Sequence, residues 1–177
     1  GVLLKMLEIL APAGGEEQLK AAVNAGADAV YLGFGMFNAR RNAKNFDFEG
    51  LCSAVKYCHG RGVKVHAALN TLVLENELES ALNDARKAAE AGVDAVIVQD
   101  LGLAKMIHES IPALPMHAST QLTIHNKSGV LEAKKLGFSR VVLARELTLN
   151  EIKDIAQSTD MEIEVFIHGA LCMCVSG

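Results

Sequence analysis

The sequence of 177 residues contains no tryptophan, only three prolines and few aromatic residues. Aromatic residues make up 5% of the chain, whereas half of all residues are hydrophobic. The core must therefore be built mainly from alanine, valine, leucine and isoleucine. A chain of this length and apolar content can bury the core of one domain.

The sequence also lacks a large excess of one charge. Its net charge is −4, so the protein as a whole has no electrostatic attraction to nucleic acid. The exception is local, because Arg40, Arg41 and Lys44 form one short basic segment. This segment is the candidate contact for an anionic ligand.

Signals for secretion and for membrane insertion are not evident. Residues 1–5 lack the charged start and long apolar run of a signal peptide. No apolar run reaches the roughly 18 residues of a membrane span. Without a secretion signal, the four cysteines indicate reduced thiols rather than a disulfide framework. We therefore expect a cytoplasmic protein without a membrane span.

A short glycine-containing motif recurs along the chain. Residues 26–30, Gly-Ala-Asp-Ala-Val, return as Gly-Val-Asp-Ala-Val at 92–96 and more loosely at 137–141. Each copy follows a helical pattern and precedes a short apolar run, which indicates a buried parallel strand. Strands are expected at residues 8–13, 28–33, 63–70, 94–100, 115–120, 140–145 and 162–168. Helices are expected at residues 16–26, 48–59, 76–91, 101–109, 127–136 and 148–158.

Strands that alternate with helices form a parallel sheet with right-handed crossovers. Two architectures fit this pattern, a doubly wound sheet and a βα barrel. The turn at residues 11–15 lacks the GxGxxG pattern of a dinucleotide-binding sheet, and the even spacing of the motif favours the barrel. We therefore predict an α/β fold, a TIM-like barrel that is incomplete, with about seven parallel strands and six helices.

The chain is short for such a barrel, which usually needs about 250 residues. We expect residues 1–177 to form a single domain that is the N-terminal part of a larger barrel enzyme. An incomplete barrel leaves the edge of its last strand unpaired, and exposed strand edges favour association with another chain. Self-association through this open edge is therefore a further expectation.

The two-residue period of a strand predicts which side chains face the barrel interior. In the third expected strand the apolar residues hold the odd positions, so Lys64, His66 and Asn70 should point inward. The same reasoning directs further polar residues inward, namely Glu8, His117, Ser119, Gln121, Glu162, Glu164 and His168. Buried charges need partners, so we expect Lys64 to pair with Glu8 or Glu164. The cluster is either a structural ion-pair plug or the polar floor of an active site.

Barrel enzymes carry their chemistry at the carboxyl ends of the strands. The catalytic candidates are the polar residues near those ends, Asn70, His117, Glu164 and His168. The long loop at residues 34–46 is rich in hydrogen-bond donors, which suits an anionic ligand, although an ordinary solvated loop has the same composition. The candidates for substrate binding are Arg40, Arg41, Lys44 and Arg145.

The four cysteines fall into two pairs. Cys52 and Cys58 lie six residues apart on one expected helix and point roughly 120° apart, so they cannot bind one metal together. They are interpreted as small core residues. Cys172 and Cys174 follow the end of the last expected strand, where a metal site is plausible but where a Cys-x-Cys pair alone is weak evidence. No HExxH, Walker A or GxSxG motif is present.

The C-terminal run matches a longer signature. It contains, in the right order and spacing, the specified residues of the pattern E-x-F-x-x-G-[SA]-[LIVM]-C-x-x-x-x-G. These residues are Glu164, Phe166, Gly169, Ala170, Leu171, Cys172 and Gly177. This order resembles the signature of the collagenase-like peptidase family, peptidase U32. Residues 10–14, 28–33 and 38–46 are also similar to that family, so the resemblance covers essentially the whole chain. We expect the sequence to stop within this motif.

The resemblance implies two kinds of activity. The family takes its name from a collagen-degrading activity, whereas other members hydroxylate RNA bases or a quinone ring without molecular oxygen. Those members resemble iron–sulfur proteins in which four cysteines hold a [4Fe-4S] cluster, with prephenate as hydroxyl donor. By the motif match, Cys172 is the first cluster ligand. The other ligands are expected beyond Gly177, so the 177 residues alone should hold no cluster.

Three hypotheses follow for the function. The favoured one is an oxygen-independent iron–sulfur hydroxylase that acts on an RNA base or another small aromatic ring. The second is a collagenase-like peptidase, as the family name states, although no set of nucleophile, base and orienting residue is evident. The third is a non-catalytic binding subunit. The partners expected for the first are RNA or an aromatic substrate, and prephenate.

Overall fold

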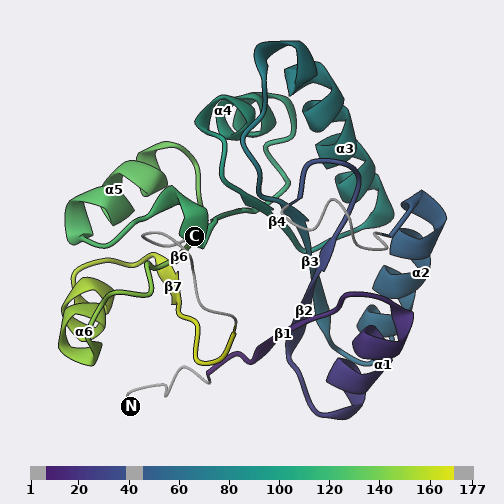
Figure 1. Ribbon diagram of the computed structural model, residues 1–177, viewed down its shortest axis with the longest axis horizontal. Coiled ribbons are helices and arrows are strands. Elements are labelled where there is room, and N and C mark those ends of the chain that lie inside the picture. The colour runs from purple at the N-terminus through teal and green to yellow at the C-terminus, as the bar shows by residue number, and fades with distance from the viewer. Residues whose placement is uncertain (1–6, 39–45, 170–177) are drawn as a thin grey trace.

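The computed structural model of the protein describes residues 7–38 and 46–169, in which strands and helices alternate (Figure 1). The strands are β1 (Leu10–Pro12), β2 (Ala29–Gly33), β3 (Lys64–Leu69), β4 (Ala95–Val98), β5 (Met116–Ala118), β6 (Arg140–Val142) and β7 (Glu162–Glu164). The α-helices are α1 (Glu16–Asn24), α2 (Phe48–His59), α3 (Leu78–Ala91), α4 (Leu101–Ser110), α5 (Lys127–Lys135) and α6 (Leu149–Gln157). Two 3₁₀ helices, η1 (Glu75–Glu77) and η2 (Thr120–Leu122), follow β3 and β5.

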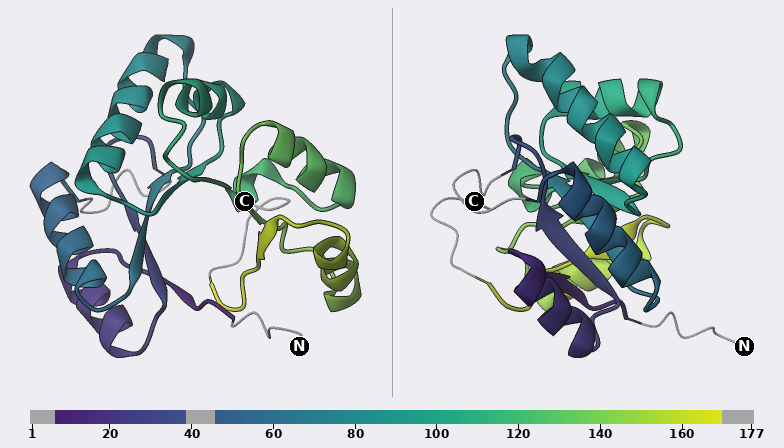
Figure 2. Two further views of the ribbon diagram at one scale, coloured as in Figure 1. Left: turned by 180° about the vertical axis from the view of Figure 1, so that it is seen from behind. Right: turned by 90° about the vertical axis from the view of Figure 1, so that its right-hand side faces the viewer.

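The strands form one parallel sheet whose spatial order is the order of the chain, from β1 to β7. A doubly wound sheet reverses its strand order at a switch point, so this topology is that of a βα barrel. The sheet curls with its helices outside, and β7 comes round toward β1 without closing the ring (Figures 1 and 2). The predicted incomplete TIM-like barrel of seven strands and six helices is confirmed.

The two edges of the sheet carry apolar side chains. Within the described residues β1 pairs only with β2, and β7 pairs only with β6. Leu7 and Ile9 at the first edge are 93% and 58% exposed, and Ile167 at the other is 93% exposed. Exposed strand edges with apolar flanks favour association, so self-association stays a prediction.

The main hydrophobic core lies between the sheet and the helices. Val65, Ala67 and Leu69 alternate along β3 and are fully buried in this core. Leu103 and Ile107 of α4 are buried in it from the helix side. The odd positions of β3 therefore face the helices, as the strand period predicted, and the even positions face the barrel interior. No helix among the described residues is long and apolar enough to span a membrane.

Side-chain caps fix where the helices begin. The Asp47 carboxylate accepts a hydrogen bond from the Gly50 amide at 2.8 Å and starts α2. The Asp100 carboxylate accepts one from the Leu103 amide at 2.8 Å and starts α4. Such caps satisfy amides that have no partner within the helix. The sequence predicted a strand that extends to residue 100. Instead Asp100 caps a helix, and β4 ends at Val98.

The recurring glycine motif has a structural role that its sequence alone did not reveal. Its third residue binds the backbone at the start of the preceding strand in all three copies. The Asp28 carboxylate accepts a hydrogen bond from the Ile9 amide at 2.8 Å, and Asp94 accepts one from the Val65 amide at 2.7 Å. Ser139 donates to the Met116 carbonyl at 3.1 Å. Each βα unit is thereby joined to the unit or strand beside it at the amino ends of the strands.

The last strand is shorter than the sequence predicted. Strand β7 covers residues 162–164 rather than 162–168. The amide of Leu143 donates to the carbonyl of Glu164 at 2.9 Å, which is the last bond between this strand and β6. Residues 165–169 continue as an irregular segment that carries the end of the family-like motif. Its alternating pattern is that of a strand, but the next strand that would pair with it is not among the described residues.

Gly35 lies in the segment after β2, and substituting it tests the contact between this segment and Asp84 of α3. Its φ is +62°, and an added methyl group would overlap the carboxylate of Asp84, which accepts a hydrogen bond from the Met36 amide at 3.4 Å. Gly26 also has a positive φ, +93°, but nothing lies within 4 Å of an added methyl group. We expect Gly26→Ala to destabilise the fold by about 1 kcal/mol and Gly35→Ala by about 2–3 kcal/mol. Urea unfolding of both variants checks this, and equal losses would contradict it.

Candidate functional site

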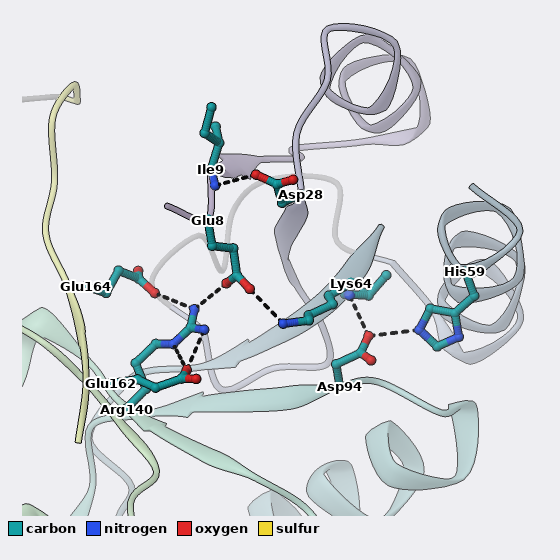
Figure 3. Close-up of polar contacts among 10 residues, drawn as sticks. Glu8, Ile9, Asp28, His59, Lys64, Asp94, Arg140, Glu162 and Glu164 are labelled. Atoms are coloured by element: carbon teal, nitrogen blue, oxygen red, sulfur yellow. Dashed lines mark hydrogen bonds and ion pairs between the residues drawn. The ribbon is translucent and has the colours of Figure 1, made fainter. Parts of the chain in front are cut away.

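A cluster of charged side chains fills the amino end of the barrel and is centred on Arg140 (Figure 3). Its guanidinium donates to Glu8 at 2.7 Å, to Glu162 at 2.7 and 2.9 Å, and to Glu164 at 3.2 Å. Lys64 donates to the other oxygen of Glu8 at 2.7 Å. Two cations therefore face three carboxylates, and the predicted pairing of Lys64 with Glu8 is confirmed.

This cluster connects β1, β3 and β6, which do not pair with one another, and also includes the paired neighbour of β6, strand β7. Glu8 precedes β1, Lys64 starts β3, Arg140 starts β6, and Glu162 starts β7. The bonds from Arg140 to Glu8 span the side on which β7 and β1 stay apart (Figure 3). Barrel enzymes carry their chemistry at the opposite, carboxyl end, and their amino end serves stability. The position therefore favours the structural plug among the two interpretations of these charges.

The cluster changes the pKa values of its members in opposite directions. Burial raises the pKa of Glu8, but the hydrogen bonds and charges of Arg140 and Lys64 outweigh it and hold the pKa at about 2. Burial dominates for Glu164 and raises its pKa, although Arg140 acts against this. Glu8 is thus a firm anion, whereas Glu164 is more easily protonated than an ordinary glutamate.

Sequence reasoning missed Arg140, which is the centre of the cluster. The side chain of Lys64 is 52% exposed, while that of Arg140 is 10% exposed, so Arg140 is the buried cation. The missed signal was the strand period in β6, where Val141 faces the helices and Arg140 and Val142 must therefore face inward. In the third copy of the glycine motif, residues 137–141, the motif position is Ser139, and Arg140 beside it has no counterpart that would mark it.

Above this cluster, two histidines meet inside the barrel. The rings of His66 and His117 touch edge to face, with centroids 4.7 Å apart, and are 1% and 5% exposed. Burial lowers the pKa of His66 to about 4, and burial with the neighbouring His66 lowers that of His117 to about 2. Both rings are therefore uncharged near pH 7. The prediction that they point inward is confirmed.

At the carboxyl end of the barrel, Arg145 lies over the ring of Phe166, with 4.1 Å from the guanidinium carbon to the ring centroid. Arg145 follows β6 and Phe166 follows β7, so this cation–π contact joins the segments after the last two strands. Asn70, which follows β3, is half-buried, and His168 is exposed. The structure thus brings Arg145 to the family-like motif, but it does not gather the four catalytic candidates at one point. The role of Arg145 in substrate binding stays a prediction.

Several predicted site residues lie outside the described residues: Arg40, Arg41, Lys44 and Cys172. In the part of the chain that the structure describes, no three histidine, cysteine or acidic residues could hold a metal ion together. Cys52 and Cys58 are free thiols on α2, and Cys58 is fully buried. Their interpretation as core residues fits this placement.

The topology of the strands and helices defines the protein as a parallel βα barrel, and comparison places it more narrowly. The model of peptidase family U32 matches residues 14–177, and the chain belongs to this family. An uncharacterized protease of Methanocaldococcus jannaschii is 43% identical over 99% of this chain and 44% of its own length.

Two further relatives carry names from RNA modification. The 23S rRNA 5-hydroxycytidine synthase of Escherichia coli is 42% identical over 97% of this chain and 26% of its own length. The tRNA hydroxylation protein P of Escherichia coli is 38% identical over 96% of this chain and 38% of its own length. The chain therefore spans less than half the length of these curated relatives.

A solved structure agrees with the barrel topology. A U32 peptidase structure superposes with a TM-score of 0.73 over 90% of this chain and 68% of its own, at 15% sequence identity. At this identity the likeness concerns the fold alone. It supports the βα barrel as the shared architecture.

The Arg140 cluster predicts a large difference between its two cations. Arg140→Met leaves the half-buried carboxylates of Glu8 and Glu164 without their main partner and removes the buried guanidinium, which should cost roughly 3–5 kcal/mol of unfolding free energy. Lys64→Met removes a half-exposed partner and should cost about 1 kcal/mol. Chemical denaturation of the two variants measures both values. A larger loss for Lys64→Met would mean that Arg140 is not the central cation.

The low pKa of Glu8 predicts a loss of stability in acid. The ordinary pKa is 4.5 and the folded value is about 2, so Glu8 stabilises the fold above pH 4.5, and this contribution disappears as the pH falls toward 2. Glu8→Gln should cost about 2 kcal/mol near pH 7, since water screens the exposed Lys64 partner, and almost nothing near pH 2. The pKa of Glu164 is shifted in the opposite direction, upward, so its own effect on stability also changes with pH. The quantity to follow is therefore the difference in unfolding free energy between wild type and variant at each pH. A constant difference across this range would contradict the assignment.

Proposed function

We propose that the full-length protein hydroxylates a pyrimidine base of RNA without using molecular oxygen. The observation that carries this proposal is the identity of about two residues in five, along nearly the whole chain, with relatives named for rRNA and tRNA hydroxylation. A quinone ring is the alternative aromatic substrate. RNA as substrate implies a cytoplasmic location, which agrees with the interpretation of the cysteines as reduced thiols.

Arg145 is the described residue best placed to contact an anionic substrate. It lies at the carboxyl end of the barrel, and the ring of Phe166 holds its guanidinium in one orientation. The N–H groups of an arginine guanidinium match the oxygens of a phosphate, such as those of the RNA backbone. Arg40, Arg41 and Lys44 would add positive charge after β2, the second strand of the same barrel. Together they supply local attraction for RNA in a protein whose net charge is negative.

Hydroxylation replaces a C–H bond of the base by C–OH and removes two electrons from the base. Without molecular oxygen, the reaction balances either with water and a separate two-electron acceptor or with an organic hydroxyl donor that is itself reduced by two electrons. We propose prephenate as the donor, because the family resemblance suggests it. The carboxylates of prephenate would bind the same arginine and lysine side chains that are proposed to bind an RNA phosphate.

A [4Fe-4S] cluster is proposed as the redox group of the full-length protein. Such clusters are held by cysteine thiolates, usually four. Cys172 is the proposed first ligand by the motif match. The described residues supply no further set of ligands, since Cys52 and Cys58 lie on α2 in and beside the core. The other ligands must come from elsewhere in the full-length protein, so no reaction step is assigned to the cluster.

A peptidase is the second candidate, since two relatives are named as a protease and as a collagenase. Hydrolysis by a serine or cysteine nucleophile needs a histidine within hydrogen-bonding reach of it. Among the described residues, His59 binds Asp94 and His125 binds the Thr123 carbonyl, and no histidine is hydrogen-bonded to a serine or cysteine. This observation favours the hydroxylase. A non-catalytic binding subunit, associated through the open edge, is the third candidate.

Iron content and RNA oxidation test the proposal. Full-length protein purified without air should be brown and carry about four irons, and Cys172→Ala should lose them. Cys52→Ala is the matched control and should keep the cluster, because Cys52 lies on α2. RNA from a strain that lacks the gene, incubated with the full-length protein and prephenate, should gain one oxygen atom on a pyrimidine, as seen by mass spectrometry.

The opposite result is equally clear. Iron-free protein that leaves RNA unchanged and cleaves denatured collagen would replace the hydroxylase by the peptidase. Protein that binds RNA but changes neither substrate, with or without iron, would favour the binding subunit. The 177 residues alone should bind no cluster.

A further inference from the structure

Exposed apolar side chains gather at the carboxyl end of the barrel. Twelve large hydrophobic residues among the described ones are exposed, and all but Leu7, Ile9, Leu131 and Leu136 lie on segments that follow the carboxyl ends of strands. The amino end instead holds the charged cluster around Arg140. Single exposed leucines are ordinary on a protein surface, but a group of them on one face marks a site of interaction.

Three leucines of this group lie together after β3 and β4. Leu72 and Leu74 are 70% and 67% exposed, and Val73 between them packs against the core. The Val73 amide donates to the Asp100 carboxylate at 3.3 Å, and Leu101, which is 53% exposed, comes next to Asp100 in the chain. The three leucines therefore share one side of the barrel rim, and we call them the leucine rim.

The backbone holds these leucines outward. The Leu74 amide donates to the Glu77 carboxylate at 3.0 Å, where η1 begins. Together with the bond from Val73 to Asp100, this contact fixes the alternation that turns Val73 inward and its two neighbours outward. Met36 adds a further exposed side chain after β2, the strand next to β3, and its amide is bound by Asp84 of α3. The exposure of the leucine rim is thus built into hydrogen-bonded segments.

Closing the barrel would not cover the leucine rim. Closure must fill the side between β7 and β1, where Ile167 and Ile9 are exposed. The leucine rim follows β3 and β4, which lie across the barrel from that side (Figures 1 and 2). A further βα unit between β7 and β1 would therefore bury the residues of the open edge and leave the leucine rim in solvent.

The chemistry of the leucine rim and the length of the relatives indicate what covers it. Proteins bind RNA through cations and aromatic rings, whereas aliphatic side chains suit the apolar centre of a protein interface. The matched 180 residues are 44% of the Methanocaldococcus jannaschii relative, so that protein is more than twice as long as the match. A complete barrel usually needs about 250 residues. A protein of that length therefore has residues for a further domain after its barrel is closed.

We propose that the leucine rim is the docking surface for a further domain of the full-length protein, formed by residues outside 1–177. The contact face of that domain is apolar, because polar groups buried against leucine side chains would be left without partners. The docked domain stands beside the carboxyl end of the barrel, where barrel enzymes bind their substrates. This arrangement is independent of the proposed chemistry and holds for a hydroxylase and a peptidase alike.

Hydroxyl-radical footprinting of the unmodified full-length protein tests whether the leucine rim is covered. Leu72 and Leu74 are more exposed in this structure than Leu131 and Leu136, which are both 37% exposed, so without a covering domain they should be oxidised faster. In the full-length protein we expect the reverse order, with Leu72 and Leu74 oxidised several-fold more slowly. All four are leucines, so the comparison reports accessibility and not side-chain reactivity.

Photo-crosslinking identifies the covering segment. A photoreactive phenylalanine analogue replaces Leu74 in the full-length protein, and the same analogue at Leu131 on α5 is the matched control. From position 74 the crosslink should run to a peptide outside residues 1–177 of the same molecule, at a yield that does not change with protein concentration. Position 131 should give no such crosslink.

Three other results would each overturn the proposal. A crosslinked product of twice the mass, with a yield that rises with protein concentration, would make a second copy of the chain the occupant. Crosslinks from position 74 that form only with added RNA would make the leucine rim an RNA contact. Oxidation of Leu72 and Leu74 at least as fast as that of Leu131 and Leu136 would mean that the leucine rim stays open to solvent.

Discussion

The bond from Arg140 to Glu8 is the constraint on which this incomplete barrel depends. No strand joins β7 to β1 among the described residues, so nothing in the sheet itself holds its two ends together. The guanidinium reaches Glu8 beside the first strand and two glutamates of the last strand at the same time. Because it is buried, its charge is stabilised by these carboxylates, and they depend on it equally. The curvature that brings the inner side chains together is therefore maintained from the amino end.

Much of the fold could be predicted from the sequence because the barrel repeats one pattern. Short apolar runs after glycine located the strands, and the alternation in β3 correctly separated Val65 and Leu69 from Lys64 and His66. The ends of strands were predicted less well. Asp100 reads as the end of a strand but caps a helix, and residues 165–169 alternate like a strand that has no partner on that side. Both depend on contacts that local sequence does not specify.

The site was predictable only in part. The period of β3 and β5 placed His66 and His117 inside, but no pattern indicated that their rings touch. Arg140 was overlooked because a single arginine at the start of a strand looks like an exposed residue. Its burial follows from the three-dimensional structure alone. The strand register places Arg140 beside Glu162, and its side chain extends across the barrel to Glu8. The contact between Arg145 and Phe166 likewise joins two segments that the sequence keeps 21 residues apart.

The aspartates of the glycine motif bear on how the chain assembles. Asp28 and Asp94 each fasten a new strand to its immediate predecessor, so each unit can dock as soon as it has been synthesised. Contacts between neighbours in sequence form quickly, whereas distant ones carry the entropy of closing a long loop. Glu8 and Arg140 are separated by 132 residues, so theirs is a late contact. During synthesis the βα units can therefore pack on one another in chain order, and the barrel curvature forms last, when Arg140 binds Glu8.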